Sequence, residues 1–226
     1  MNHHLAPDMS FCFIGAGAVM LDLKADRYYR LDRRHSAALR AMAGGECNAH
    51  LDARASLVAK GLIRPGDGPA ATPVSAPRVT ASVIERRLSW RPETQNCSIS
   101  PLELFALRFM AGQVLGRLGL FRTARYYRGR RDRCHEQQGG LQRSQDRAAA
   151  LAACFADQRR FFPAKRRCVP DSLALAAILW RRGCAAEVFF GVRLDPFAAH
   201  CWVQHGALLL SDPLDSVAEF TPVFQL

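Results

Sequence analysis

Residues 166–175 read Arg166-Arg167-Cys168-Val169-Pro170-Asp171-Ser172-Leu173-Ala174-Leu175, and this stretch predicts a helix that begins near a cysteine. Pro170 suits the first turn, because the amide hydrogen that proline lacks would have no intrahelical partner there. Apolar residues then recur at helical spacing as far as Trp180, and Gly183 marks the end of the helix. A thiol in the first turn lies in the positive field of the helix dipole, which lowers its pKa. Cys168 is therefore a candidate nucleophile.

We expect the other cysteines to be structural rather than reactive. The chain has eight cysteines, and a free cysteine usually behaves as a small buried apolar group. No two of them form a C-x-x-C pair, so the sequence indicates no metal site, and we expect no cofactor. The chain is long enough for its own core and begins with no signal peptide pattern, which predicts reduced thiols and a cytoplasmic protein.

A base and an orienting carboxylate follow Cys168 along the chain. Thiol catalysis needs a base that shares the proton and a third group that fixes the imidazole. His200 lies in a predicted strand at 199–204, and Asp212 ends the next predicted strand at 207–212. We expect Cys168, His200 and Asp212 to form the catalytic set, with Asp215 and Asp195 as alternative carboxylates.

Strand parity makes this expectation testable. A two-residue loop at His205-Gly206 would place His200 opposite Ser211 and turn Asp212 to the other face of the hairpin. A three-residue loop at 204–206 would place His200 and Asp212 diagonally on one face. The triad therefore predicts the odd-numbered loop or an equivalent bulge.

Composition divides the chain once. Residues 65–77 are rich in proline, glycine and small side chains, which is typical of a linker. We expect one domain at 1–64, a linker at 65–80 and a second domain at 81–226. In the first, strands at 10–14, 18–23 and 27–31 are separated by turns at 15–17 and 24–26. A helix capped by Asp32 and ending at Ala43, and a second helix at 51–60 ending at Gly61, complete an order typical of a small winged-helix-like domain. In the second, helices at 100–120, 144–159 and from Cys168 precede strands, which predicts an α+β fold.

The net charge of +11 is concentrated between Arg122 and Arg167. Six arginines between 122 and 133 surround Tyr126 and Tyr127, a composition that could follow a nucleic-acid backbone or form a solvated helical face. We favour the solvated face, because basic composition speaks to association rather than to fold. In the first domain the candidate recognition helix offers only Arg54 and Lys60 as cations, so we expect that domain to bind a peptide by strand addition rather than DNA. Charged residues interrupt the most apolar helix, at 100–120, so we expect no membrane insertion.

The segments 167–175, 191–204, 211–212 and 220–222 together resemble the transglutaminase-like leader peptidase of lasso-peptide biosynthesis, the B protein. The segment 19–32 (Val-Met-Leu-Asp-Leu-Lys-Ala-Asp-Arg-Tyr-Tyr-Arg-Leu-Asp) resembles the PqqD-like precursor-recognition element that is fused to that peptidase in many clusters. Two positions depart from the family pattern: Gln204 stands where Glu is common, and Asp171 where a basic residue is frequent.

The resemblance implies a papain- or transglutaminase-like cysteine peptidase that uses Cys168, His200 and Asp212 to remove the leader of a ribosomal precursor. It also implies that the precursor's leader adds as a strand to residues 27–31, beside the helix that carries Leu57. The leader-binding residues would be Arg27, Tyr28, Tyr29, Arg30, Leu31 and Leu57. The implied partner is an asparagine-synthetase-like cyclase that uses ATP.

Two other functions remain open from the sequence. If an amine replaced water as the acceptor, the same three residues would form an acyltransferase or transamidase. Alternatively, the winged-helix-like module and the basic segment could form a nucleic-acid-binding regulator whose second domain is catalytically inactive.

Overall fold

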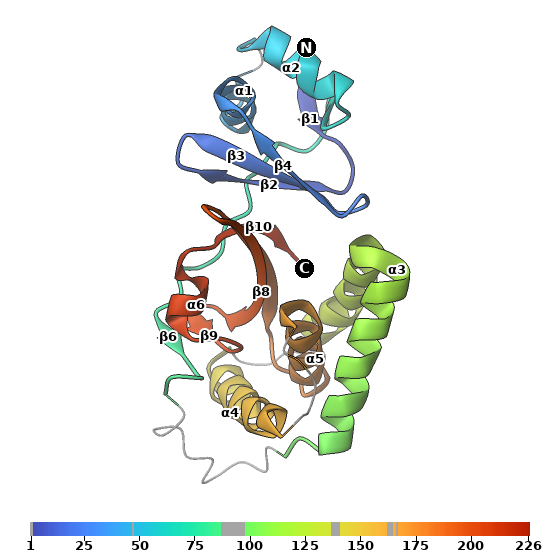
Figure 1. Cartoon of the computed structure of the whole chain (residues 1–226), viewed down its shortest axis with the longest axis vertical. Coiled ribbons are helices and arrows are strands. Elements are labelled where there is room, and N and C mark those ends of the chain that lie inside the picture. Colours follow the sequence, from blue (N-terminus) through green and yellow to red (C-terminus); the bar gives the residue numbers. More distant parts are fainter. Residues whose placement is uncertain (1, 47, 87–97, 137–140, 162–164, 166) are drawn as a thin grey trace. The chain divides into compact units, whose positions relative to one another are not determined.

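The computed structural model describes residues 2–46, 48–86, 98–136, 141–161, 165 and 167–226 (Figure 1). The chain divides into two compact units. Unit 1 comprises Met1–Ser75 with Thr221–Phe224, and unit 2 comprises Ala76–Phe220 with Gln225–Leu226. Residues 66–80, within the expected linker, contain no helix or strand.

Unit 1 is built on an antiparallel sheet with the strand order β2-β3-β4. These strands are Met9–Ile14, Gly17–Asp22 and Arg27–Leu31, each within one residue of its predicted bounds. Among the strands that the structure describes, β4 has β3 as its single neighbour. Its other edge is therefore not used by this sheet.

Two helices cover the strands of unit 1, and both were predicted. Helix α1 (Arg33–Ala43) is capped by Asp32, whose carboxylate accepts a hydrogen bond from the His35 amide at 2.8 Å. Helix α2 (Leu51–Ala59) ends just before Gly61, which has a positive φ of 71°. The sequence therefore predicted β2, β3, β4, α1 and α2 from turn and cap residues.

A short strand pair was not predicted. Strand β1 (His3–Leu5) pairs antiparallel with β5 (Ile63–Pro65), and three residues are too few to show the alternation of a strand. Ile63 joins a core that contains Phe11, Met20, Leu39 and Leu57, all of them fully buried. This core packs the two helices against the sheet.

The strands β7, β8, β9 and β6 of unit 2 belong to a five-stranded sheet with the order β10-β7-β8-β9-β6. The strands are β6 (Ala81–Ser82), β7 (Glu187–Leu194), β8 (Phe197–His205), β9 (Leu208–Leu209) and β10 (Thr221–Gln225). Strands β7 and β8 form a long antiparallel hairpin, whereas β6 runs parallel to β9. Helices followed by strands confirm the predicted α+β order, while β6, β10 and the short helix α6 (Leu214–Ala218) are additions.

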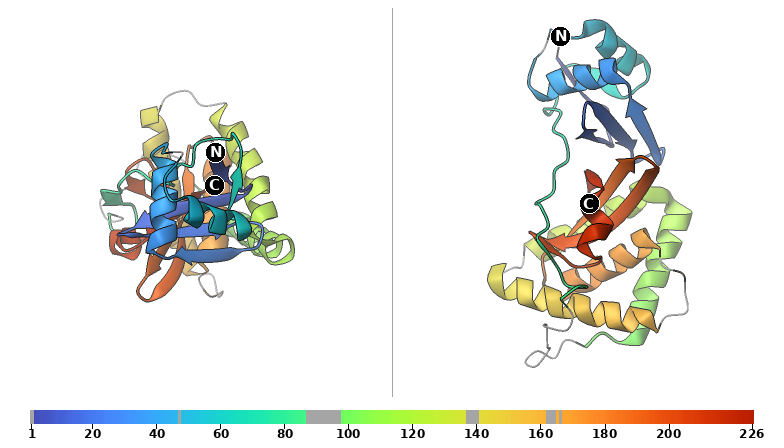
Figure 2. Two further views of the ribbon diagram at one scale, coloured as in Figure 1. Left: turned by 90° about the horizontal axis from the view of Figure 1, so that it is seen from above. Right: turned by 60° about the vertical axis from the view of Figure 1, so that its left-hand side comes forward.

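Helix α5 (Cys168–Arg181) packs against β8, and helices α3 and α4 lie beside it (Figures 1 and 2). It begins at Cys168, and Gly183 follows its end with a φ of 74°, so both predicted ends are confirmed. From Ser172 to Trp180 every residue is buried. Burial on all sides fixes the helix, and with it the position of Cys168.

Helix α3 (Pro101–His135) is broken at Gly119, where φ is 70° and ψ is 175°. The predicted helix at 100–120 is its first half, and the basic segment 122–133 forms its second. By length and composition Pro101–Arg133 could cross a membrane, although a core helix passes the same test. Most of this apolar stretch is exposed or half-buried, while Leu104, Leu107 and Ala111 are buried in unit 2. Helix α4 (Leu141–Arg160) follows.

Candidate active site

Three elements of unit 2 bring Cys168, His200 and Asp212 together. Cys168 is the first residue of α5, His200 lies in β8, and Asp212 lies in the bend that follows β9. His200 Nε2 donates a hydrogen bond to Asp212 Oδ1 at 3.2 Å. The Cys168 thiol interacts with the same imidazole, which lowers the pKa of the thiol and raises that of the ring. Because Asp212 occupies Nε2, Nδ1 is the ring nitrogen left to exchange a proton with sulfur.

The pKa values of the pair are shifted in opposite directions. Burial raises the pKa of the Cys168 thiol, but the hydrogen bond and charge of His200 and hydrogen bonds with the backbone of Cys201 and Val169 outweigh it and lower that pKa overall. Burial also disfavours the charged imidazole, yet its hydrogen bonds to Asp212 and Cys168 raise the pKa of His200 to about 9. The arrangement therefore favours a thiolate beside an imidazolium at neutral pH.

Two aromatic rings hold the imidazole in place. The Trp202 ring stacks on that of His200 at 6.4 Å and 18°, and the Phe220 ring lies 5.4 Å away at 43°. His200 pairs across the hairpin with Gly191. A Cβ at Gly191 would lie 2.5 Å from the Trp202 ring and 3.1 Å from Phe220 Cβ. Glycine is therefore required for the rings to close around His200.

Gln204 holds the Trp202 ring of this cluster through a hydrogen bond. Its side chain is buried, and Oε1 accepts a hydrogen bond from Trp202 Nε1 at 2.8 Å. Its Nε2 donates to the carbonyls of Pro77 at 3.1 Å and Gly206 at 2.8 Å. The amide both accepts and donates, which an ionised glutamate could not do. This gives the departure at position 204 a structural reason.

The prediction of a three-residue loop at 204–206 is wrong. Gln204 pairs with Leu209 and His205 with Leu208, so the loop is the two-residue Gly206-Ala207. Continued in that register, the hairpin would turn the side chains of His200 and Asp212 to opposite faces. The strand pairing ends after Leu209, however, and the chain bends at 210–212. This bend, rather than loop parity, brings Asp212 to His200.

An ion cluster anchors the start of α5. Asp171 Oδ1 accepts hydrogen bonds from Arg108 Nε at 2.6 Å and Arg159 Nε at 3.1 Å, and Oδ2 accepts one from the Arg167 amide at 3.1 Å. Arg108 also donates to the Lys165 carbonyl at 2.7 Å. Asp171, the second departure from the family pattern, thus ties α3 and α4 to the turn that carries Cys168.

A cavity of about 190 Å³ adjoins the thiol. Apolar side chains of Ile84, Phe155, Leu210 and Pro213 line it, together with Cys168, Cys201, Asp171, Asp212, Arg159 and Arg160. Burial raises the pKa of the Cys201 thiol well above its usual range, and that of Cys12 to about 12. Cys168 is thus the cysteine that the site activates; Cys47 and Cys97 lie outside the described residues.

The residues expected to bind a leader lie in unit 1. Arg27 and Arg30 on β4 are exposed, Tyr28 and Tyr29 are half-buried, and Leu31 is buried. Leu57 is completely buried in the core, so it supports α2 from inside and cannot line a docking surface. Arg54 is also buried, which leaves α2 without one of the two cations that nucleic-acid recognition would use.

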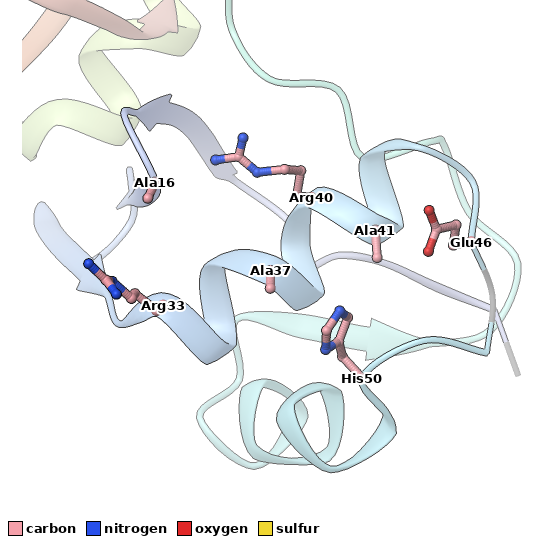
Figure 3. Close-up of a pocket in the computed structure, with 7 residues that line it drawn as sticks. All are labelled: Ala16, Arg33, Ala37, Arg40, Ala41, Glu46 and His50. Carbon is pink, nitrogen blue, oxygen red and sulfur yellow. The ribbon is translucent and has the colours of Figure 1, made fainter.

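Unit 1 also has a broad hollow of about 740 Å³ beside α1 (Figure 3). It is lined by Ala16, Arg33, Ala37, Arg40, Ala41, Glu46 and His50. Arg40 is held by the Gly15 carbonyl at 3.2 Å and lies over the Phe13 ring. This hollow contains no nucleophile beside a base, and among the described residues no cluster of His, Cys, Asp and Glu could hold a metal ion. The candidate active site is therefore in unit 2.

Comparison with known proteins gives a family match for part of the chain. No curated protein and no solved structure matches the chain. The family model of the transglutaminase-like superfamily matches residues 114–225, a range that contains Cys168, His200 and Asp212. That fold accommodates cysteine peptidases and transamidases alike. The C-terminal part of the chain is a transglutaminase-like domain.

Proposed function

We propose that the protein is a cysteine peptidase that binds and removes the leader of a ribosomally made lasso-peptide precursor. The observation that carries the chemistry is the hydrogen bond between His200 and Asp212, together with the interaction of the same imidazole with Cys168, inside a transglutaminase-like domain. Support for the precursor comes from the resemblance of residues 19–32 and 167–222 to the B protein of this pathway.

The first half of the reaction forms a thioester. The Cys168 thiolate attacks the carbonyl carbon at the end of the leader, and the carbonyl electrons move to oxygen. Amides of the first helical turn have no intrahelical acceptor, so that of Cys168 can donate to the oxyanion. As the oxyanion collapses, the carbon–nitrogen bond breaks and the His200 imidazolium gives its proton to the leaving amine.

The second half regenerates the enzyme. Neutral His200 takes a proton from water, and the water oxygen attacks the thioester carbon. The carbon–sulfur bond then breaks, which returns the thiolate and releases the leader as a carboxylic acid. Asp212 keeps the imidazole oriented through Nε2 in both halves of the reaction.

Recognition of the leader is assigned to β4 of a PqqD-like unit 1. An extended peptide can add as a strand to a sheet edge, where main-chain hydrogen bonds supply the affinity. Arg27, Tyr28, Tyr29 and Arg30 supply the side chains around that edge, and Leu57 contributes only by supporting α2. The amine released by cleavage would pass to an asparagine-synthetase-like cyclase as partner, in the cytoplasm.

The proposal is tested with the full chain and a precursor peptide, with and without the cyclase. Mass spectrometry should show wild-type protein releasing the leader with a new carboxylic acid, and the Cys168→Ala variant releasing none. A trapped thioester to Cys168 would identify the nucleophile. An intact precursor with folded wild-type protein under both conditions would refute the peptidase assignment.

A transamidase is the second candidate, because the same fold accommodates it. The two reactions share the thioester and differ only in the acceptor. Cleavage in the presence of a primary amine separates them: hydrolysis adds the mass of water to the leader, whereas aminolysis adds the mass of the amine.

A further inference from the structure

The hairpin between β8 and β9 ends at an irregular hydrogen bond. In a regular antiparallel pair, two facing residues exchange both of their backbone hydrogen bonds. Leu210 N donates to Val203 O at 2.8 Å, but Val203 N donates to the Ser211 hydroxyl at 2.9 Å rather than to Leu210 O. The Ser211 side chain thus replaces a backbone acceptor at the point where the chain leaves the strand.

The same hydroxyl contacts the carboxylate that serves His200. Ser211 Oγ donates a short hydrogen bond to Asp212 Oδ2, while Asp212 Oδ1 accepts from His200 Nε2. A second serine holds the main chain of this residue, since Ser82 Oγ donates to Asp212 O at 2.7 Å. Both the carboxylate and the backbone of Asp212 are therefore fixed by serine hydroxyls from different parts of unit 2.

We propose that Ser211 is a positioning residue of the active site, whose hydroxyl ends the hairpin and holds the Asp212 carboxylate in the orientation that His200 requires. This inference rests on the Cys168, His200 and Asp212 site of the proposed function. One hydroxyl uses its lone pair for Val203 N–H and its proton for Asp212, so both interactions are lost together when it is removed.

The consequence should appear in the ionisation of Cys168. Without the Ser211 proton the carboxylate can turn toward solvent, so it stabilises the His200 imidazolium less and the thiolate loses part of its counter-charge. Other charged or titratable groups around the pair are Cys201 on β8, Asp171 on α5, and Arg159 and Arg160 on α4. None of these is altered by a change at Ser211.

The test measures the rate at which iodoacetamide alkylates Cys168 as a function of pH, with modified Cys168 followed by peptide mass spectrometry. Ser211→Ala should move the midpoint of this profile upward by about 0.5 to 1 pH unit, because a hydrogen bond to a charged group is lost. At a pH below the wild-type midpoint the alkylation rate should therefore fall by about 3- to 10-fold. Ser211→Thr keeps the hydroxyl and should keep the wild-type midpoint.

Thr123→Val is the control. Thr123 is a buried residue of α3 in the same unit, and its hydroxyl donates to the Gly119 carbonyl at 2.8 Å rather than to a residue of the site. Its removal should leave the midpoint unchanged. A wild-type midpoint in Ser211→Ala, an equal shift in Thr123→Val, or a folded Ser211→Thr variant that behaves like Ser211→Ala would overturn the assignment.

These outcomes are separable from those of the proposed function, because alkylation needs no peptide substrate. If the midpoint shifts in Ser211→Ala but the wild-type protein leaves precursor intact, the peptidase assignment fails alone. If the wild-type protein cleaves precursor and Ser211→Ala has the wild-type midpoint, the role of Ser211 fails alone.

Discussion

At the scale of single residues, Cys168 and His200 share one proton. In the folded protein the thiol pKa is lowered and the imidazole pKa is raised to about 9, which favours a thiolate beside an imidazolium. In the unfolded chain, between pH 6.5 and 9, the same residues are a thiol and a neutral imidazole. The ion pair and the unfolded pair each hold one proton, so wherever the ion pair is formed these two residues add nothing to the pH dependence of stability.

Cys168→Ser should make the stability of the protein depend on pH, because the folded and unfolded states then bind different numbers of protons. The variant keeps the hydrogen bond from His200 to Asp212, so the folded imidazole still holds its proton above pH 6.5, where the unfolded one loses it. Its free energy of unfolding should fall with rising pH from 6.5, by at most about 1.4 kcal/mol per pH unit relative to wild type. Urea denaturation at several pH values measures this. Cys154→Ser is the control; a Cys168→Ser curve parallel to it would show that the ion pair does not form.

Gln204 gives a second prediction at this scale. Gln204→Glu keeps the shape and the acceptor for Trp202 but loses the donor to two carbonyls and buries a charge. We expect a loss of about 1–3 kcal/mol in the free energy of unfolding at pH 7, which thermal or urea denaturation would measure. Gln113→Glu, on the surface of α3, should change stability little. An equally small effect at both positions would contradict the assigned network.

At the scale of elements, the β7–β8 hairpin positions His200 because Gly191, which has no side chain, leaves space for the rings of Trp202 and Phe220. Gly191→Ala would put a methyl group against Trp202 and Phe220, at a cost of about 1–3 kcal/mol. Because Trp202 stacks on His200, alkylation of Cys168 should also slow. Gly116→Ala, a helical position with no atom near the added methyl, should be neutral or slightly stabilising. Unchanged stability and reactivity in Gly191→Ala would show that the hairpin tolerates the displacement.

At the scale of the whole molecule, the proposed function requires that one chain both binds the leader at β4 and cuts the peptide at Cys168. Successive residues of an edge strand direct their backbone groups alternately toward the neighbouring strand and away from it. Of the adjacent variants Tyr29→Pro and Arg30→Pro, one should therefore lose an outward amide and weaken leader binding by at least about tenfold, while the fold stays intact. The other should lose a bond to β3 and destabilise unit 1.

Fluorescence anisotropy with a labelled leader and thermal denaturation of the full chain separate these effects. The same substitution at Arg27, the first residue of β4, compares the end of the edge with its middle. If both central variants bind the leader as wild type does, recognition does not use this edge.

Much of the fold could be predicted from local sequence patterns such as turns and helix caps. The strands β2, β3 and β4 were predicted from alternation and turn residues, α1 from the Asp32 cap, and the two ends of α5 from Pro170 and Gly183. These signals act within a few residues, which is why the sequence reveals them. The short strands β1, β5, β6 and β10 depend on distant partners, and no local pattern marks them.

The sequence by itself determined which residues could do the chemistry, because a thiol at a helix start and a histidine in a strand follow from local pattern. Only the tertiary structure decided how Asp212 reaches His200. If the strand pairing continued in its register, the Asp212 side chain would point away from His200. Because the pairing ends at Val203, and the hydroxyls of Ser211 and Ser82 bond to Asp212, its carboxylate reaches His200. Such contacts join segments up to 130 residues apart, and their geometry exists only once the chain has folded.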